Sequence, residues 1–270
     1  MRPRLVFLTR SFPFRGPDDS FLGSEVAVLS RHFDIHFVPT GPPPSEETPR
    51  LAATQKVDTT LANSPRKMTL DTARGMFVGD VRREVKSQRH RSLRMRAIVS
   101  RRWARISAGK RWARKHLVPQ IKEHSTLVYS WWSVPEALGV AEALRSSGVP
   151  MVTRMHGYDL YAERDRLNFI PFQRQLIDSV NKVYSASQAG EHYLRSRYPD
   201  LSSKLSYAYL GVDAAPGISQ SSNDGIFRVV SCSSLVPVKR VELLVSALLM
   251  LRARGVKFYW THIGDGPDRQ

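Results

Sequence analysis

Short apolar runs alternate with segments of helical periodicity along most of the chain. The runs have the length of buried strands and lie at 4–9, 35–38, 126–132, 149–155, 182–186 and 205–210. The segments between them predict helices at 25–31, 133–145, 172–179 and 188–197. Because strands joined by helices pair in parallel with right-handed crossovers, this order predicts an α/β fold with a parallel sheet. Ligands of such sheets bind beyond the carboxyl ends of the strands.

Two local signals set the bounds of the helix at 133–145. Ser133 and Glu136 have the spacing of a capping box, which predicts that the Ser133 side chain caps the start of this helix. Gly148 follows the helical segment and predicts its end, since glycine adopts the left-handed conformation that closes many helices.

A change of composition near residue 216 indicates a domain boundary. The segment 216–225 contains Gly, Ser, Asn and Asp with almost no apolar residue, as linkers do. A new pattern then begins, with strands at 227–232 and 257–263 and a helix at 241–252. We therefore expect an N-terminal domain over 1–215, a linker over 216–225 and an incomplete second domain over 226–270.

The stretch from 41 to about 122 departs from the regular alternation. Residues 41–66 are rich in Pro, Ser, Thr and acids and predict an exposed, partly disordered connection. Helical periodicity follows, and one apolar stripe among arginines consists of Met95, Val99, Trp103 and Ile106. These features predict an amphipathic helix inside a basic helical stretch at 82–116.

The positive charge of the chain is concentrated in that basic helical stretch. The net charge is +17, and between Arg82 and Lys115 there are 14 Lys or Arg residues against one acid, Glu84, which amounts to +13. A concentrated charge indicates a partner more than a uniform excess does. Three interpretations are open: a solvated helix face, contact with an anionic membrane surface, and binding of nucleic acid. No nucleic-acid-binding module accompanies the stretch, so nucleic acid is the least favoured.

Two classes of protein are disfavoured by the rest of the chain. No segment approaches the ~20 apolar residues that cross a bilayer, and the best run, 243–251, is interrupted by Ser246. Arg2 and Arg4 precede an apolar run that is too short for a secretory signal. The single cysteine, Cys232, cannot form a disulfide within the chain. These features together predict a cytoplasmic protein.

The residues best placed for chemistry follow a predicted strand. His156 and Gly157 come directly after the strand at 149–155, where a side chain projects into the crevice and a glycine lets a ligand approach the backbone. Asp159 is close enough in sequence to orient its neighbours. A lone histidine at a turn is more often a surface or packing residue, so this assignment depends on the surrounding motifs.

Four segments in a fixed order carry a family resemblance. They are M-H-G-Y-D-L-Y at 155–161, S-A-S at 185–187, L-G-V-D at 210–213, and S-S-L-V-P-V-K-R at 233–240 leading to H-I-G-D-G-P at 262–267. Together they resemble the retaining GT-B glycosyltransferases, particularly those that build bacterial surface polysaccharides. The resemblance covers 125–270 and, more weakly, 1–40. It implies two facing Rossmann-like domains, here one domain with a parallel sheet and the first β-α-β unit of a second.

The resemblance also implies an activity and a mechanism. A sugar would pass from a nucleotide-diphosphate sugar, held mainly by the second domain, to a saccharide or lipid-linked acceptor, held mainly by the first. No metal and no cofactor are implied. The acceptor hydroxyl would attack from the front side while the donor phosphate takes its proton, so catalysis would come from positioning and charge stabilisation. A paired-carboxylate arrangement, as in glycosidases, is not expected.

On the first domain, the resemblance assigns His156 to contact with the transferred sugar, and Asp159 is the second catalytic candidate. Gly157 and Gly23 are the candidates for the acceptor side of the cleft. Gly23 follows the first strand, where the family has a glycine-containing loop that borders the cleft.

On the second domain, Lys239 matches the lysine that binds the donor phosphate, and the glycine turn with Gly264 and Gly266 matches a nucleotide-binding turn. The family commonly has a Gly-Arg dipeptide whose arginine lies five residues before that lysine. Ser233 and Ser234 stand there in this chain, so a charge-assisted contact is absent or supplied elsewhere. Arg240 is the candidate substitute.

Past the glycine turn, the family's second domain continues with a base pocket and an acidic pair that this sequence does not contain. We therefore expect weak binding of nucleotide sugars and little or no turnover by this chain. The basic helical stretch adds the expectation of a peripheral location on the inner membrane face. The alternative function is a basic protein that binds a membrane surface or nucleic acid without transferase activity.

Overall fold

The computed structural model describes residues 2–15, 19–42, 49, 52, 55–62, 65–88, 92–123, 125–220 and 222–269. The chain divides into two compact units, Met1–Asp213 and Ala214–Gln270. The domain end expected at 215 lies close to this division. Part of the connection expected at 41–66, namely residues 43–48, 50–51, 53–54 and 63–64, lies outside the described residues.

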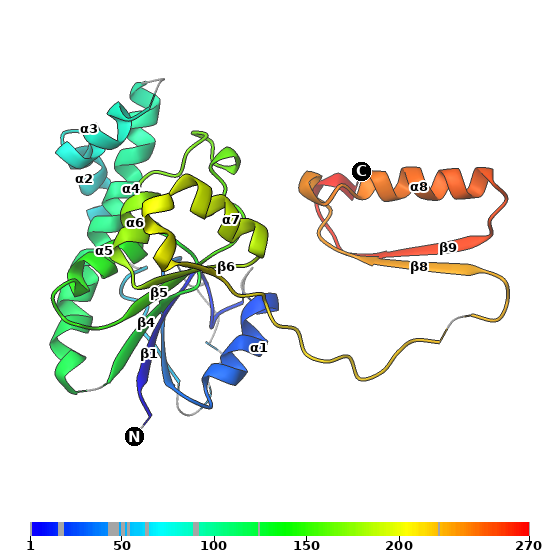
Figure 1. The fold of residues 1–270 in the computed structure, drawn as a ribbon, viewed down its shortest axis with the longest axis horizontal. Coiled ribbons are helices and arrows are strands. Elements are labelled where there is room, and N and C mark those ends of the chain that lie inside the picture. The colour runs from blue at the N-terminus through cyan, green and yellow to red at the C-terminus, as the bar shows by residue number, and fades with distance from the viewer. Residues whose placement is uncertain are drawn as a thin grey trace. The chain divides into compact units, whose positions relative to one another are not determined.

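A seven-stranded parallel sheet forms the centre of the first unit (Figure 1). Its strands are β1 (Arg4–Thr9), β2 (Asp34–Pro39), β3 (Lys56–Val57), β4 (Thr126–Ser130), β5 (Met151–Met155), β6 (Lys182–Ser185) and β7 (Leu205–Tyr207). They lie in the order β3-β2-β1-β4-β5-β6-β7, and each neighbouring pair is parallel. The predicted α/β fold is therefore confirmed; the short β3 is the strand that the hydrophobic pattern did not indicate.

Helices connect these strands. They are α1 (Asp19–Leu29), α2 (Pro65–Gly75), α3 (Gly79–Lys86), α4 (Leu93–Trp112), α5 (Pro135–Leu144), α6 (Gln173–Ser179) and α7 (Gln188–Arg197). A π-helical turn, η1 (Ala113–Leu117), and a 3-10 turn, η2 (Val118–Glu123), continue α4 toward β4. Shorter 3-10 turns are η3 (Ala162–Arg164) and η4 (Pro199–Lys204). Helix α1 begins at Asp19, earlier than the expected residue 25.

Both faces of the sheet are covered, which explains why β1 is apolar at consecutive positions from Leu5 to Leu8. In β1, Leu5 and Phe7 pack in the cluster that contains α1, whereas Val6 and Leu8 pack in the cluster that contains α4 and α5. Figure 1 shows α1 on one side of β1 and the other two helices on the opposite side. The alternation of side chains along a strand thus divides one apolar run between two cores.

The apolar stripe of the basic helical stretch faces the protein interior. Val99 and Ile106 of α4 are buried, and Met95 and Trp103 are partly buried against the same core. The stripe is therefore a packing surface and does not offer an apolar face to a lipid surface. Only the charged side of α4 is available for any contact with a membrane.

Helices α4 and α5 cross closely because glycines stand at the crossing. A Cβ at Gly139 would lie 1.9 Å from the carbonyl oxygen of Ile106, and one at Gly109 would lie 2.3 Å from that of Glu136. Glu136 itself is buried and accepts a hydrogen bond from Nε of Arg105 at 2.6 Å. The end of the α5 segment is as predicted, since Gly148 has a φ of +71°.

Many basic side chains in the basic helical stretch have carboxylate partners. The ion pairs of α4 are Arg102–Asp165, Arg105–Glu136, Lys110–Glu142 at 2.8 Å and Arg111–Asp71 at 2.5 Å. These pairs connect α4 to α2, to α5 and to the segment before α6. Part of the charge in this stretch therefore serves to hold the helical layer together.

The second unit is a strand–helix–strand unit, as expected. It contains β8 (Phe227–Cys232), η5 (Pro237–Lys239), α8 (Val241–Ala253), β9 (Phe258–Ile263) and η6 (Pro267–Arg269). The two strands pair in parallel. Leu248 is the one buried apolar side chain among the described residues of this unit. Between β7 and β8, the described residues 208–220 and 222–226 contain no helix or strand.

None of the helices in the described part of the chain has both the length and the apolar character required to cross a lipid bilayer.

Candidate functional site

The order of the strands reverses at β1 and β4, which places the crevice of the sheet beyond their carboxyl ends. Trp131 and Trp132 directly follow β4 at this point. The backbone N–H of Trp131 donates to the carbonyl oxygen of Leu8 at 2.9 Å, so this tryptophan remains beside β1. The first unit therefore has two large aromatic residues at the position where α/β sheets bind ligands.

His156 lies beside these tryptophans, directly after β5. Its ring centroid is 5.1 Å from that of Trp131 and 4.2 Å from that of Trp132. The residue is half-buried, and both ring nitrogens are shielded from solvent. Tyr158 packs on the other indole, with its ring centroid 5.0 Å from that of Trp132 and 46% of its surface exposed. The four rings form an aromatic cluster at the carboxyl edge of β4 and β5.

The Asp159 carboxylate joins the loops that follow β4 and β5. Its Oδ1 accepts the backbone N–H of His156 at 2.7 Å, and its Oδ2 accepts the backbone N–H of Ser133 at 3.0 Å. The carboxylate is buried, and this burial raises its pKa to about 6. Asp159 therefore positions the backbone of His156 and holds the aromatic cluster together through backbone contacts.

The capping box predicted at the start of α5 is not formed. The Ser133 hydroxyl contacts Asp159, donating to its carbonyl oxygen at 3.1 Å, and the residue before α5 is Val134. The Glu136 side chain pairs with Arg105. The prediction was wrong because both side chains found stronger partners from distant parts of the chain than the helix terminus offered.

A buried polar network packs against Trp131. The Arg154 guanidinium lies 5.0 Å from the centroid of the Trp131 ring, and its Nε donates to the Tyr129 hydroxyl at 3.0 Å. That hydroxyl donates to Glu25 of α1 at 2.9 Å. Burial, together with the Glu25 charge, raises the pKa of Tyr129, so the hydroxyl keeps its proton. Sequence reasoning missed this network; the charged Arg154 in the strand at 149–155 was the signal.

The two glycine candidates of the first unit differ in their surroundings. Gly157 follows His156, and a Cβ there would meet the end of the Arg164 side chain at 2.7 Å, which is flexible enough to move. Gly23 lies inside α1 and has nothing within 4 Å of an added Cβ. The expectation that Gly23 occupies a loop is therefore wrong, because α1 begins before it.

The two middle motifs have structural roles in the first unit. In S-A-S, the Ser187 hydroxyl accepts the backbone N–H of Gly190 at 3.1 Å and caps α7. In L-G-V-D, the Asp213 carboxylate accepts a hydrogen bond from the Ser24 hydroxyl of α1 at 2.8 Å.

In the second unit, Lys239 and Arg240 lie between β8 and α8 and are exposed. Lys239 ends the 3-10 turn η5. Arg240 has a left-handed backbone with φ of 53° and directly precedes α8. Both cations therefore stand at the carboxyl edge of β8, beside the start of a helix, where the helix dipole also favours an anion.

The glycine turn of the second unit lets two strand-end loops pack together. A Cβ at Gly264 would lie 1.9 Å from the Ser233 carbonyl oxygen, and one at Gly266 would lie 2.1 Å from that of Leu235. The backbone N–H of Leu235 donates to the Asp265 carbonyl oxygen at 3.0 Å. These glycines are thus required for backbone contact within the unit, whether or not a nucleotide approaches them.

In the part of the chain that the structure describes, His, Cys, Asp and Glu side chains form no group of three or more that is suited to a metal ion.

No family model matches the chain, and no curated protein sequence matches it. Solved structures do. The lipopolysaccharide outer core galactosyltransferase WaaB in its apo form matches with a TM-score of 0.56 at 13% identity, over 98% of this chain and 62% of that chain. A UDP-forming alpha,alpha-trehalose-phosphate synthase from Burkholderia vietnamiensis matches with a TM-score of 0.54 at 12% identity, over 99% and 64%.

A third match is the corresponding synthase from Burkholderia xenovorans in complex with glucose-6-phosphate, with a TM-score of 0.52, 11% identity, and coverage of 99% of this chain and 67% of that chain. The chain thus spans less than two thirds of the length of the first two proteins. At these identities the likeness concerns the fold. The chain has a GT-B-type fold: a Rossmann-like domain with a parallel sheet, followed by a β-α-β unit with two parallel strands.

Proposed function

We propose that this chain carries the acceptor-binding domain and part of the donor-binding domain of a retaining glycosyltransferase. The reaction moves a sugar from a nucleotide-diphosphate sugar to a saccharide or lipid-linked acceptor, in polysaccharide biosynthesis. The observation that carries the proposal is the loop with His156 and Asp159, which is held at the carboxyl edge of a parallel sheet beside the point where the strand order reverses. The likeness in fold to a galactosyltransferase supports it.

On the acceptor side, His156 contacts the transferred sugar, and Asp159 positions His156. The carboxylate holds the His156 backbone at 2.7 Å, so a change in Asp159 displaces the histidine without removing it. A displacement of this kind reduces the rate of a reaction that depends on alignment. Gly157 lets the acceptor approach the backbone next to His156 when the flexible end of the Arg164 side chain moves aside.

On the donor side, Lys239 and Arg240 bind the diphosphate, and the turn with Gly264 and Gly266 borders the nucleotide. The bond between the anomeric carbon and the phosphate oxygen breaks, and the acceptor oxygen bonds to the same face of that carbon. The acceptor proton passes to the departing phosphate oxygen. Cations at the diphosphate stabilise the charge that develops there. No metal is part of the proposed site.

Binding measurements test this function without requiring turnover. We would titrate the chain with uridine, guanosine and adenosine diphosphates and with their hexose conjugates. Lys239→Ala is expected to weaken binding of the best diphosphate about tenfold or more, since a charge-assisted contact contributes roughly 1.5–3 kcal/mol. The matched control is Lys257→Ala, another exposed cation of the second unit, with an expected change below twofold.

His156→Ala is expected to weaken binding of the nucleotide sugar and to leave binding of the diphosphate alone unchanged, because the histidine contacts the sugar. The control is His192→Ala, which removes an exposed histidine of α7. Equal affinities of all variants for all ligands, or the absence of any nucleotide binding by the unaltered chain, would show that the proposed function is wrong.

Contact with an anionic membrane surface is part of the proposal for the whole protein. It relies on the exposed cations of the basic helical stretch, such as Arg94 and Lys115, since the apolar stripe of α4 is occupied by packing. Retention on anionic vesicles that weakens with salt, with no retention on neutral vesicles, is expected. Equal retention on both kinds of vesicle would exclude an electrostatic contact.

A further inference from the structure

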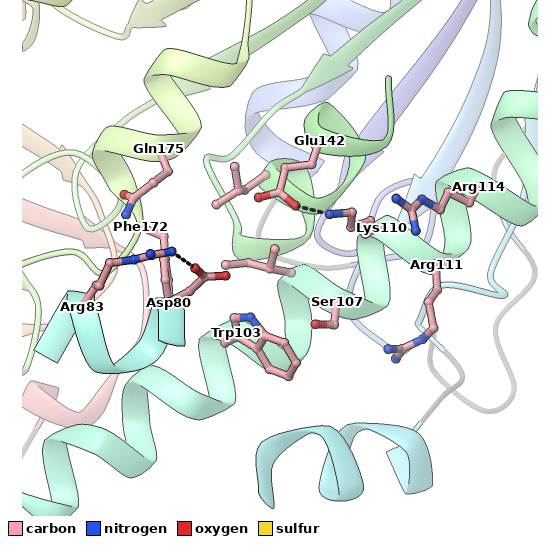
Figure 2. Close-up of a pocket in the computed structure, with 12 residues that line it drawn as sticks. Asp80, Arg83, Trp103, Ser107, Lys110, Arg111, Arg114, Glu142, Phe172 and Gln175 are labelled. Atoms are coloured by element: carbon pink, nitrogen blue, oxygen red, sulfur yellow. Dashed lines mark hydrogen bonds and ion pairs between the residues drawn. The ribbon is translucent and has the colours of Figure 1, made fainter. Parts of the chain in front are cut away.

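A pocket of about 590 Å³ lies in the helical layer that covers the sheet opposite α1 (Figure 2). Its walls come from α3, from α4 with the first π-helical residues, from α5, and from the beginning of α6. The volume is within the ~300–1,000 Å³ of small-molecule sites. None of the family motifs contributes to this pocket.

The pocket has cations on two walls. Arg83 comes from α3, whereas Lys110, Arg111 and Arg114 come from the C-terminal part of α4 and from η1 (Figure 2). Lys110 and Arg111 are partnered by Glu142 and Asp71, and Arg83 pairs with Asp80. Arg114 forms no ion pair with any residue that the structure describes. The residue is exposed, so its guanidinium is available to a ligand.

The same pocket has groups that suit hydroxyls. The carboxylates of Asp80 and Glu142, the amide of Gln175 and the hydroxyl of Ser107 line it. Carboxylates accept hydrogen bonds from sugar hydroxyls but repel a simple anion, whereas arginines bind phosphate oxygens. Neither a bare anion nor a neutral sugar would use both sets of groups.

Part of the lining of the pocket is apolar. The apolar side chains are those of Trp103, Ile106, Leu138 and Phe172. Aromatic and aliphatic side chains suit the C–H face of a sugar ring, which is the part of a saccharide that makes apolar contacts. The lining therefore has three kinds of group: cations for a phosphate, polar acceptors and donors for hydroxyls, and apolar side chains for the ring.

We propose that this pocket binds a phosphorylated saccharide or polyol, with the phosphate at Arg114 and Lys110 and the hydroxyls at Glu142 and Asp80. The proposal is independent of the proposed transferase activity, because the pocket lies in the helical layer and not at the carboxyl edge of the sheet. The ligand has two sources, a soluble sugar phosphate or the polyol phosphate headgroup of a lipid.

The first experiment titrates the 270-residue chain with glucose 1-phosphate, glucose and inorganic phosphate, followed by calorimetry. Glucose 1-phosphate is expected to bind at least tenfold more tightly than either of the others. Arg114→Gln is expected to weaken this binding at least tenfold. The matched control is Arg101→Gln, an exposed arginine of α4 that does not line the pocket, with less than a twofold effect. Far-ultraviolet circular dichroism verifies that both variants fold.

A second variant separates a sugar phosphate site from general attraction of anions. Glu142→Gln removes a carboxylate while keeping the shape of the side chain. It is expected to weaken binding of glucose 1-phosphate at least threefold and to leave inorganic phosphate unchanged or more tightly bound. If Glu142→Gln tightens both ligands equally, or if Arg101→Gln weakens binding as much as Arg114→Gln does, the attraction is diffuse and the proposal is wrong.

Vesicles identify the source of the ligand. Phosphatidylinositol and phosphatidylglycerol have the same charge, but only the first carries a polyol ring. Stronger retention on phosphatidylinositol than on phosphatidylglycerol, with the excess lost in Arg114→Gln and displaced by glucose 1-phosphate, would assign the lipid headgroup. Binding of glucose 1-phosphate without such selective retention would assign the soluble source. If neither probe binds in a way that depends on Arg114, the proposal is overturned.

Discussion

The Asp159 carboxylate accepts the backbone N–H of His156 at 2.7 Å with one oxygen, while its other oxygen accepts that of Ser133. One buried charge therefore connects the loops that follow two neighbouring strands. Removing it releases the histidine and the aromatic cluster at once. This contact links the stability of the first unit to the geometry of the candidate site.

The stability of the first unit should depend on pH through Asp159. Burial raises the pKa of this carboxyl from 3.8 to about 6, so the folded protein holds a proton that the unfolded chain has lost. The raised pKa of Asp159 therefore adds to the free energy of unfolding of the first unit. This addition is complete below about pH 4 and is lost as the pH rises through about 6. The difference corresponds to roughly 3 kcal/mol, at 1.36 kcal/mol per pH unit.

The test measures urea unfolding of the unaltered chain and of Asp159→Asn between pH 4 and pH 8. The free energy of unfolding of the unaltered chain, relative to that of Asp159→Asn, should decrease from pH 4 to about pH 6.5 and then stay constant, because asparagine does not titrate. Asp178→Asn is the control, since that side chain is 67% exposed. An advantage that grows with pH over this range would contradict the prediction.

Gly139→Ala should destabilise the first unit by about 2–3 kcal/mol. Alanine favours a helix by about 1 kcal/mol over glycine, but the new Cβ would lie 1.9 Å from the Ile106 carbonyl oxygen and force α4 and α5 apart. Gly23→Ala is the matched control in α1, where nothing lies within 4 Å, and it should stabilise by up to about 1 kcal/mol. Thermal unfolding of the two variants should shift in opposite directions.

Arg105→Ala should cost more stability than Arg174→Ala. The Arg105 partner, Glu136, is 4% exposed, so its charge would remain in the interior without a cation. We expect Arg105→Ala to lower the free energy of unfolding by about 3 kcal/mol. This is at the lower end of the losses measured for broken buried ion pairs, because Arg105 itself is 38% exposed.

The comparison pair Arg174–Asp200 is 54% and 55% exposed and should contribute less than about 1 kcal/mol. Chemical denaturation of both alanine variants checks the order. The double variant Arg105→Ala with Glu136→Gln should recover part of the loss, because no charge is then left buried. Equal losses for Arg105→Ala and Arg174→Ala would contradict this account.

Gly266→Ala should loosen the second unit. The added Cβ would lie 2.1 Å from the Leu235 carbonyl oxygen, and backbone atoms at this position cannot rotate away as a side chain can. Amide hydrogen exchange should accelerate at Leu235 and Asp268, whose N–H groups donate across this contact. Gly217→Ala, in an open segment, should leave exchange unchanged. Unchanged exchange in Gly266→Ala would show that the loops do not need this close approach.

Sequence patterns predicted the elements that depend on local periodicity. The bounds of β1 and α7 agree with the expected ranges, and the predicted strand–helix–strand pattern of the second unit is confirmed. The hydrophobic pattern did not predict the early start of α1 or the two-residue strand β3. A strand of two residues has no periodicity to detect.

The sequence by itself determined the α/β class and placed His156 and Asp159 after a strand, because alternation of apolar runs and residue order are properties of the chain alone. Only the tertiary structure decided that Ser133 binds Asp159 instead of capping α5, that Arg154 supports Trp131, and that the apolar stripe of α4 meets α5. These contacts join residues that are far apart in sequence. A polar group satisfies itself with whichever partner the fold brings within hydrogen-bonding distance, and local spacing does not contain that information.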